Sequence, residues 1–315
     1  MRNVIVSMSA IHLSEAALRS SSVEVAPAKS GMLLSVGPNR CAPRVGGRVR
    51  CICANISSVE RILSARGLVK EFRRAVAVDG VDIEVKAGER VALLGPNGAG
   101  KTTTLLMILG AISPDKGEVE ICGVPQRKNR SEAAEHVGFA AGYLPLAGEM
   151  KVREYLTMYG QIYGIPDPAR AIAEGLERFR IQHLAEAKGT QLSSGQRTLV
   201  GIVRAVLHKP SLLVLDEPTA SLDPDVAGRV RAGILELCAD HGTALLVTSH
   251  DMLEVERLCE RVLVLSAGRI VADGAPSEIA KRFGREDLEG VFLHLANENY
   301  QPSDSPTSQH TDHIL

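Results

Sequence analysis

The chain has 315 residues, 45% of them hydrophobic, and a formal net charge of −1, with no tryptophan. This composition suits one large globular domain or two small ones, and it lacks the basic surface and aromatic platforms typical of nucleic-acid-binding proteins, so no nucleic acid is expected among its partners. No run approaches 18 apolar residues, so we expect that the chain does not span a membrane by itself.

Residues 1–59 differ in composition from the remainder. They contain no aromatic residue and seven Lys or Arg against two Glu. An Arg- and Ser-rich, acid-poor start can also be a targeting segment, but no convincing order of charge, apolar core and cleavage site is present. We expect a disordered or misassigned N-terminal extension, followed by one nucleotide-binding domain over residues 60–283 and a polar C-terminal tail over residues 284–315, whose apolar content is too low for packing.

The first part of this domain is strand-like. Apolar and charged residues alternate at Val81, Ile83 and Val85, and again within residues 117–123. This period of two predicts a small antiparallel sheet beside the main one.

A glycine-rich segment, GPNGAGKT, lies between an apolar run at residues 90–94, predicted to be a strand, and a predicted helix at residues 101–109. Its backbone N–H groups can surround phosphates, Lys101 can reach the β- and γ-phosphates, and the Thr102 hydroxyl can ligate Mg²⁺. A plain glycine-rich turn is the alternative, which the strand-to-helix setting disfavours. The expected nucleotide contacts are Gly95, Pro96, Asn97, Gly98, Ala99, Gly100, Lys101, Thr102 and Thr103.

Residues 140–190 turn helical. Tyr155, Tyr159 and Tyr163 recur every four residues and therefore share one helix face, which is either a core stripe or a docking surface for a membrane partner. The pentapeptide LSSGQ at residues 192–196 then precedes a predicted helix ending near Leu207. Ser193 suits an N-cap and Gly195 permits close approach of backbone, a combination that predicts a second anion site.

Two buried strands are expected at residues 211–215 and 244–249. The first delivers Asp216 and Glu217 to its carboxyl end, where ligands bind in open parallel sheets. By the logic of phosphoryl transfer, Asp216 holds Mg²⁺ and Glu217 orients the attacking water. His250 ends the second strand and is expected to contact the γ-phosphate. The alternatives are a solvated acidic pair and a polar strand cap.

In their order and spacing, GPNGAGKT, LSSGQ, LLVLDEP, SLD at residues 221–223 and SH at residues 249–250 resemble the ATP-binding cassette (ABC) transporter family over about residues 61–283. The similarity is to the ATP-binding subunits of exporters, such as those for sodium. It implies an α/β fold of the P-loop NTPase type, with a small antiparallel β subdomain and a helical subdomain.

The resemblance also implies an ATPase with ATP and Mg²⁺ as cofactors. It implies a head-to-tail dimer with a second ATP-binding subunit, in which Ser193, Ser194, Gly195 and Gln196 of one chain clamp the ATP held by the other. Asp223 would link the two sites, and Phe72 would stack on adenine unless it is a core residue. An integral membrane permease would be the partner, which places the protein in the cytoplasm, peripherally on the inner face of the cell membrane.

Two positions depart from the family. Ser194 replaces a glycine, a small change that we expect to preserve the contact. The family's metal-contacting glutamine falls at Gly142 or, in another alignment, at Leu146, and neither side chain can ligate a metal. This gap leaves a weakly catalytic regulatory module as an alternative function. A soluble ABC ATPase acting on ribosomes or DNA is a further alternative, disfavoured by the single cassette and by the short spacing between Lys101 and the pentapeptide.

Overall fold

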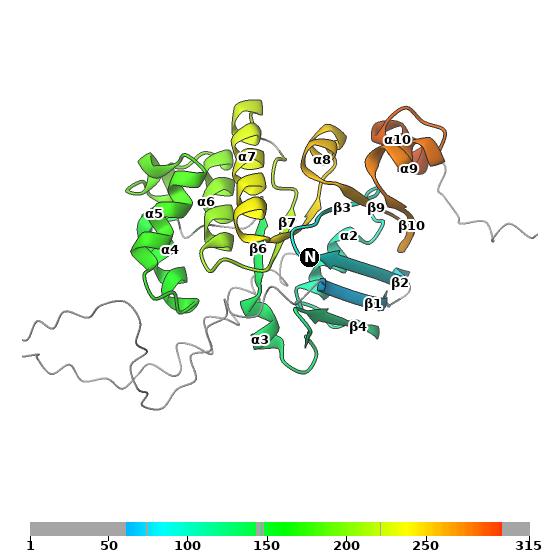
Figure 1. The fold of residues 1–315 in the computed structure, drawn as a ribbon, viewed down its shortest axis with the longest axis horizontal. Coiled ribbons are helices and arrows are strands. Elements are labelled where there is room, and N and C mark those ends of the chain that lie inside the picture. Colours follow the sequence, from blue (N-terminus) through cyan, green and yellow to red (C-terminus); the bar gives the residue numbers. More distant parts are fainter. Residues whose placement is uncertain (1–60, 74, 143–145, 147, 221, 298–315) are drawn as a thin grey trace, which may run out of the picture. The chain divides into compact units, whose positions relative to one another are not determined.

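The described part of the chain is organised by two sheets (Figure 1). The computed structural model describes residues 61–73, 75–142, 146, 148–220 and 222–297. The expected N-terminal extension and Ser221 lie outside these ranges. The strands are β1 (Arg61–Phe72), β2 (Ala75–Lys86), β3 (Arg90–Leu94), β4 (Lys116–Ile121), β5 (Val124–Pro125), β6 (Val137–Ala141), β7 (Leu212–Asp216), β8 (Ala244–Thr248), β9 (Arg261–Ser266) and β10 (Arg269–Gly274). The helices are α2 (Lys101–Ile108), α3 (Arg130–Glu135), α4 (Val152–Ile162), α5 (Pro168–Arg178), α6 (Ser194–Val206), α7 (Pro224–His241), α8 (Met252–Leu258), α9 (Pro276–Arg282) and α10 (Leu288–Asn297), with 3₁₀ turns η3 (Gln182–Leu184) and η4 (Gly189–Gln191).

The smaller sheet is antiparallel and has the strand order β2-β1-β4-β5. In β2, Val81, Ile83 and Val85 are buried while Asp82 and Glu84 between them are exposed. Because successive side chains of a strand point to opposite faces, this alternation buries one face of the sheet. The antiparallel sheet predicted from the sequence is confirmed.

The larger sheet has the order β10-β9-β3-β8-β7-β6, and all its neighbours pair in parallel except β10 with β9. Every residue of β7 and β8 is buried, as expected for strands covered on both faces. Leu213 and Leu215 belong to an apolar cluster with α6 and α7, whereas Leu212 and Val214 belong to a second cluster with α2 and the smaller sheet. Because β3, β8 and β7 are adjacent and parallel, their carboxyl ends lie along one edge.

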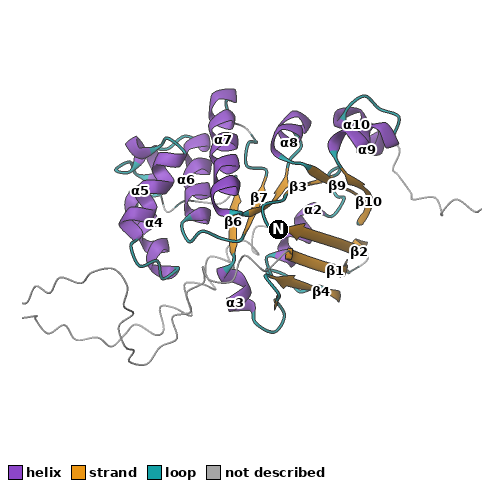
Figure 2. Ribbon diagram, in the orientation of Figure 1, coloured by secondary structure: helices purple, strands orange, loops and turns teal. Residues whose placement is uncertain are grey.

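Helices α4, α5 and α6 form the predicted helical segment, grouped on one side of the larger sheet (Figure 2). The tyrosine stripe faces its interior, since Tyr155 is only 5% exposed and its ring lies 5.0 Å from that of Tyr159. The guanidinium of Arg204, on α6, lies 5.2 Å from the Tyr159 ring centroid. The core interpretation therefore holds for Tyr155, whereas Tyr159 and Tyr163 are half-buried and the docking alternative stays untested for them.

A half-buried histidine, His208, follows α6. His208 stacks on Tyr163 with 4.2 Å between ring centroids, and its Nε2 lies 3.2 Å from the carbonyl oxygen of Val137. Its Nδ1 is buried without a hydrogen-bond partner among the described residues. Burial lowers the pKa of His208 to about 4.

A depressed histidine pKa means that the folded state holds the ring neutral and loses stability as the pH falls below the unfolded value of about 6.5. Between pH 7 and pH 5 the protein should therefore lose about 2 kcal/mol of unfolding free energy through this group. His208→Phe keeps the stack and does not titrate, so urea unfolding of this variant should show a pH dependence weaker by that amount. Parallel pH profiles of variant and wild type would contradict the assignment.

The C-terminal boundary differs from the expected one. Residues 284–297 were expected in the polar tail, but Leu288–Asn297 forms α10, with Leu288, Val291 and Leu295 buried. The apolar residues recur at helical spacing, so a short segment buries one face despite its polar neighbours. The packed fold thus continues to at least the end of α10.

Candidate active site

The glycine-rich loop lies between β3 and α2, as predicted. Gly95 and Gly100 have φ values of 153° and 107°, and a Cβ atom would lie 2.1 Å from the Leu265 carbonyl oxygen at Gly95 and 2.3 Å from that of Ala77 at Gly100. Only glycine fits at both positions. Gly100, the N-cap residue of α2, makes no side-chain hydrogen bond to the start of the helix. The first backbone N–H groups of α2 are therefore available to bind an anion. The remaining predicted contacts, Pro96, Asn97, Gly98, Ala99, Lys101, Thr102 and Thr103, occupy this loop and the first turn of α2.

Lys101 folds back onto this loop. Its ammonium donates hydrogen bonds to the carbonyl oxygens of Gly95, at 2.5 Å, and Pro96, at 3.1 Å. Burial lowers the pKa of Lys101, while the charges of Glu217 and Asp216 oppose the shift. These two carboxylates therefore lie close enough to act on the ammonium, so the structure brings together the residues predicted from the ends of β3 and β7.

Thr248 forms hydrogen bonds with both Asp216 and Glu217. The sequence analysis did not predict a role for this threonine. The Thr248 hydroxyl donates to Oδ1 of Asp216 at 2.5 Å and accepts from the Glu217 N–H at 3.2 Å. Asp216 is 7% exposed and Thr248 is 1% exposed. The sequence does contain a sign of this role, because Thr248 is a polar residue at the end of an otherwise apolar strand. A buried hydroxyl there needs a hydrogen-bond partner.

Removing this hydroxyl should damage the site more than the fold. Thr248→Val leaves a buried carboxylate without one donor, so we expect a loss of about 1–3 kcal/mol in unfolding free energy and a larger proportional fall in ATP hydrolysis. Thr243→Val is the matched control, since the Thr243 hydroxyl is equally buried at the other end of β8 and donates to the Pro210 carbonyl oxygen. Urea unfolding and phosphate release should show similar destabilisation but lost hydrolysis only at residue 248. Equal effects on hydrolysis would contradict a positioning role.

Glu217 and His250 contact each other directly. Oε2 of Glu217 lies 2.7 Å from Nδ1 of His250, and Glu217 has a left-handed backbone with φ of 53°. A non-glycine residue in this region is strained, and such strain clusters at functional sites. The His250 side chain is 68% exposed and that of Glu217 is 29% exposed, so both can meet a ligand.

The pentapeptide caps α6 as predicted. The Ser193 hydroxyl accepts from the Gln196 N–H at 3.2 Å, and the Gln196 side chain accepts from the Ser193 N–H at 2.9 Å. Ser193 and Ser194 are exposed, and Gly195 is half-buried beside Leu222. In the described part of the chain, no hydrogen bond joins this segment to the glycine-rich loop. Asp223 is the N-cap residue of α7, without a side-chain cap bond.

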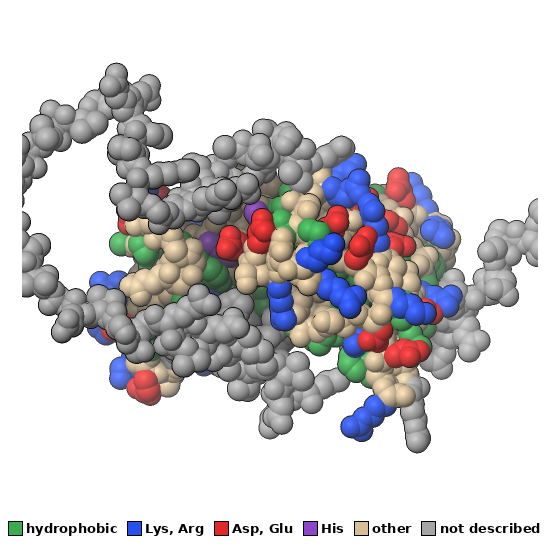
Figure 3. Space-filling view, turned by 90° about the horizontal axis from the view of Figure 1, so that it is seen from below, with side chains coloured by type: hydrophobic (Ala, Val, Ile, Leu, Met, Phe, Trp, Pro, Cys, Tyr) green, Lys and Arg blue, Asp and Glu red, His purple; other side chains and the backbone are tan. Residues whose placement is uncertain are grey.

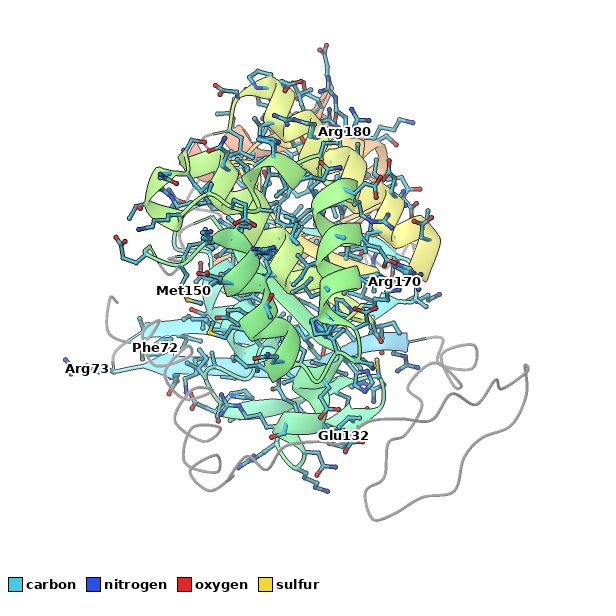
Figure 4. All side chains as sticks on the ribbon, turned by 90° about the vertical axis from the view of Figure 1, so that its left-hand side faces the viewer. Phe72, Arg73, Glu132, Met150, Arg170 and Arg180 are labelled. Atoms are coloured by element: carbon cyan, nitrogen blue, oxygen red, sulfur yellow. The ribbon has the colours of Figure 1, made fainter. Side chains whose placement is uncertain are left out.

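Phe72 ends β1 and is 48% exposed, so the alternative of a core residue is wrong. Figure 4 shows it beside Arg73, at the tip of the β1–β2 hairpin. An exposed aromatic ring at a hairpin tip is available for stacking on a flat ligand.

Gly142 and Leu146 line one small cavity, and Leu146 also packs against the apolar cluster that includes residues of α6. The Gly142 N–H donates to the Asp216 carbonyl oxygen at 3.4 Å. A Cβ atom at Gly142 would lie 3.4 Å from the Glu217 carbonyl oxygen, an ordinary contact. This cavity of about 10 Å³, also lined by residues such as Thr198 and Arg204, has room for one water molecule. The contacts of a Cβ atom at Gly142 therefore do not by themselves require glycine at this position.

Comparison with known proteins decides the family. Residues 78–220 match the model of the ABC transporter family. The Nod factor export ATP-binding protein I of Burkholderia lata is 39% identical over 213 residues, covering 67% of this chain and 70% of that protein. The chain belongs to the ABC transporter family.

Solved structures of ABC cassettes share this fold. CbiO1 from Clostridium perfringens, part of the ABC transporter complex CbiONQ, is 26% identical, with a TM-score of 0.65 and coverage of 76% of this chain and 98% of that one. An ABC cassette in its ADP conformation is 28% identical, with a TM-score of 0.64 and coverage of 76% and 99%. The expected fold class, that of the ABC ATP-binding domain, is confirmed. The protein is an ATP-binding subunit of an ABC transporter and an ATPase. Within the described residues, no helix combines the length and apolarity needed to cross a bilayer.

Proposed function

We propose that this ABC ATPase powers export through a separate integral membrane permease, working in the cytoplasm on the inner face of the cell membrane as a head-to-tail dimer, most simply a homodimer. The catalytic part rests on the Glu217–His250 contact at 2.7 Å, made just after the carboxyl ends of β7 and β8, at the edge of the sheet where β3 leads into the glycine-rich loop. The relatives named for export of Nod factor support the direction of transport.

In this proposal the residues of the site divide phosphate binding and activation of water between them. Gly95 to Thr103 bind the phosphates through backbone N–H groups, and Lys101 leaves the loop carbonyls to neutralise the β- and γ-phosphates. Glu217 accepts a proton from the attacking water, and His250 orients Glu217 and contacts the γ-phosphate.

The donor set suits Mg²⁺, because the exposed Thr102 hydroxyl and the Asp216 carboxylate are hard oxygen ligands. When bound, the ion neutralises charge on the phosphates. Thr248 holds the Asp216 carboxylate in place for it, through the hydrogen bond at 2.5 Å.

The ATP site of the partner subunit would be completed by Ser193, Ser194, Gly195 and Gln196. In the described part of the chain, these residues make no hydrogen bond with the glycine-rich loop of their own chain. The α6 N-terminus is suited to the γ-phosphate by its dipole and N–H groups. Asp223 would communicate between the two sites.

Membrane flotation tests the partnership. We expect the full chain to float with membranes when it is expressed with its permease, an integral membrane protein to be sought among the neighbouring genes, and to stay in the dense fraction without that protein. ATP hydrolysis by those membranes should be lost in the Glu217→Gln variant. Flotation independent of any membrane protein, or a permease that binds no cassette, would contradict the proposed function.

A further inference from the structure

The tip of the β1–β2 hairpin lies against the nucleotide loop. The Ala77 carbonyl oxygen, on β2, is 2.3 Å from the position that a Cβ atom would take at Gly100. Phe72 pairs with Ala75, two residues before Ala77. At about 3.3 Å per residue, Ala75 is roughly 7 Å along β2 from Ala77, so the end of β1 that carries Phe72 lies near the loop that receives the phosphates.

Lys70 and Phe72 are two residues apart on β1, and their side chains meet although the pairing with β2 shifts register between Lys70 and Glu71. Its ammonium nitrogen is 5.7 Å from the Phe72 ring centroid, within the range of a cation–π contact. The Lys70 side chain is 17% exposed, which is low for lysine. One side of the ring therefore carries a fixed positive charge, while the residue as a whole remains half exposed.

Asp115 fixes this lysine. Its Oδ1 accepts from the Lys70 ammonium at 2.8 Å, and its Oδ2 accepts from the Glu71 N–H at 2.8 Å. The Ser113 carbonyl oxygen takes a second ammonium hydrogen at 2.9 Å. An ammonium has three N–H donors, so two are committed here and little is left for a phosphate. The carboxylate thus ties the strand carrying Phe72 to the segment before β4.

We infer that Lys70 and Asp115 are positioning residues for the base of the nucleotide: they hold the Phe72 ring in place and draw electron density from it, so that its free face stacks on a purine. The inference rests on the proposed adenine contact of Phe72. A ring polarised by a cation on one face attracts an electron-rich base more strongly on the other. Lys70 therefore contributes to affinity for the base and not for the triphosphate.

Binding of two probes separates these contributions. In a Glu217→Gln background, which prevents consumption of ATP, the dissociation constants of ATP and of inorganic tripolyphosphate are measured for the full chain with Mg²⁺. We expect Lys70→Met and Asp115→Asn to weaken ATP binding by roughly two- to fivefold, within the contribution of one aromatic stacking contact, and to leave tripolyphosphate binding unchanged. Lys70→Arg, which keeps the charge, should restore most of the ATP affinity.

Two controls belong to this experiment. Lys151→Met removes a lysine from a surface ion pair with Glu186, and it should change neither dissociation constant. Phe72→Ala should weaken ATP binding more than Lys70→Met, and Lys70→Met should add nothing in its presence, because both act through one ring.

The possible failures are distinguishable. Equal weakening of ATP and tripolyphosphate by Lys70→Met would overturn the inference and indicate a phosphate contact. Loss of ATP affinity in Phe72→Ala but not in Lys70→Met would overturn it while the proposed function stands. Unchanged ATP binding in Phe72→Ala would remove the adenine contact and the inference together. Failure of the wild-type chain to bind ATP would overturn the proposed function itself.

Discussion

Glu217→Gln should reduce steady ATP hydrolysis by about two to four orders of magnitude, the usual contribution of a positioned general base. ATP binding should be retained, because glutamine has the same size and the phosphates are held by the loop before α2. The strained backbone of Glu217, with φ of 53°, is held by its N–H bonds to Thr248 and does not depend on the side-chain charge. Phosphate release and equilibrium ATP binding, measured on the same preparation, check both parts.

A matched substitution elsewhere guards against a general effect of losing a carboxylate. Glu278 accepts from the Ala275 N–H at the start of α9, at 3.2 Å, and a glutamine can make the same bond. Glu278→Gln should hydrolyse ATP at the wild-type rate. Unchanged ATP turnover in Glu217→Gln would contradict the assignment of Glu217 as the general base.

The second large effect separates the two halves of the ATP site. Lys101→Met should weaken ATP binding by about one to two orders of magnitude, as expected for loss of a charge-assisted hydrogen bond. Gly195→Asp places a carboxylate at the proposed anion site of α6, so it should abolish hydrolysis by repulsion of the γ-phosphate while its own loop still binds ATP. A Cβ atom there meets the ends of two side chains, Leu222 at 3.1 Å and Val226 at 3.6 Å, and no backbone atom, so the fold should survive.

Thermal unfolding, ATP binding and phosphate release distinguish these outcomes. Loss of ATP binding in Gly195→Asp would mean that the pentapeptide contacts the nucleotide of its own chain. Wild-type hydrolysis in either variant would contradict the role assigned to the changed residue.

Much of this site was predictable because its chemistry depends on local order. The loop glycines, the α6 N-cap and the strand ending in Asp216 each follow from a few consecutive residues, and a parallel sheet brings such strand ends together. Thr248 and Lys70 were missed because their value depends on neighbours 32 and 45 positions away, Asp216 and Asp115 respectively. No period or spacing in one sequence predicts which strand lies beside another at that precision.

The C-terminal region illustrates the opposite problem. Residues 284–297 read as polar by composition, but three residues at helical spacing suffice to bury one face of α10.

Surface charge was also hard to interpret from net charge alone. Figure 3 shows Lys and Arg interspersed with Asp and Glu on the described part of one face. A net charge near zero is therefore the sum of many opposite charges, some of them in ion pairs such as Arg269 with Asp79.

The central claim is that each ATP site is shared by two chains. Mixing the Lys101→Met and Gly195→Asp variants tests it directly. In an equimolar mixture, half of the dimers contain one subunit of each variant. Each such mixed dimer has one ATP site in which both the glycine-rich loop and the pentapeptide are intact. We therefore predict that two variants inactive alone recover about a quarter of the wild-type hydrolysis when mixed. A mixture no more active than its separate components would contradict the shared site.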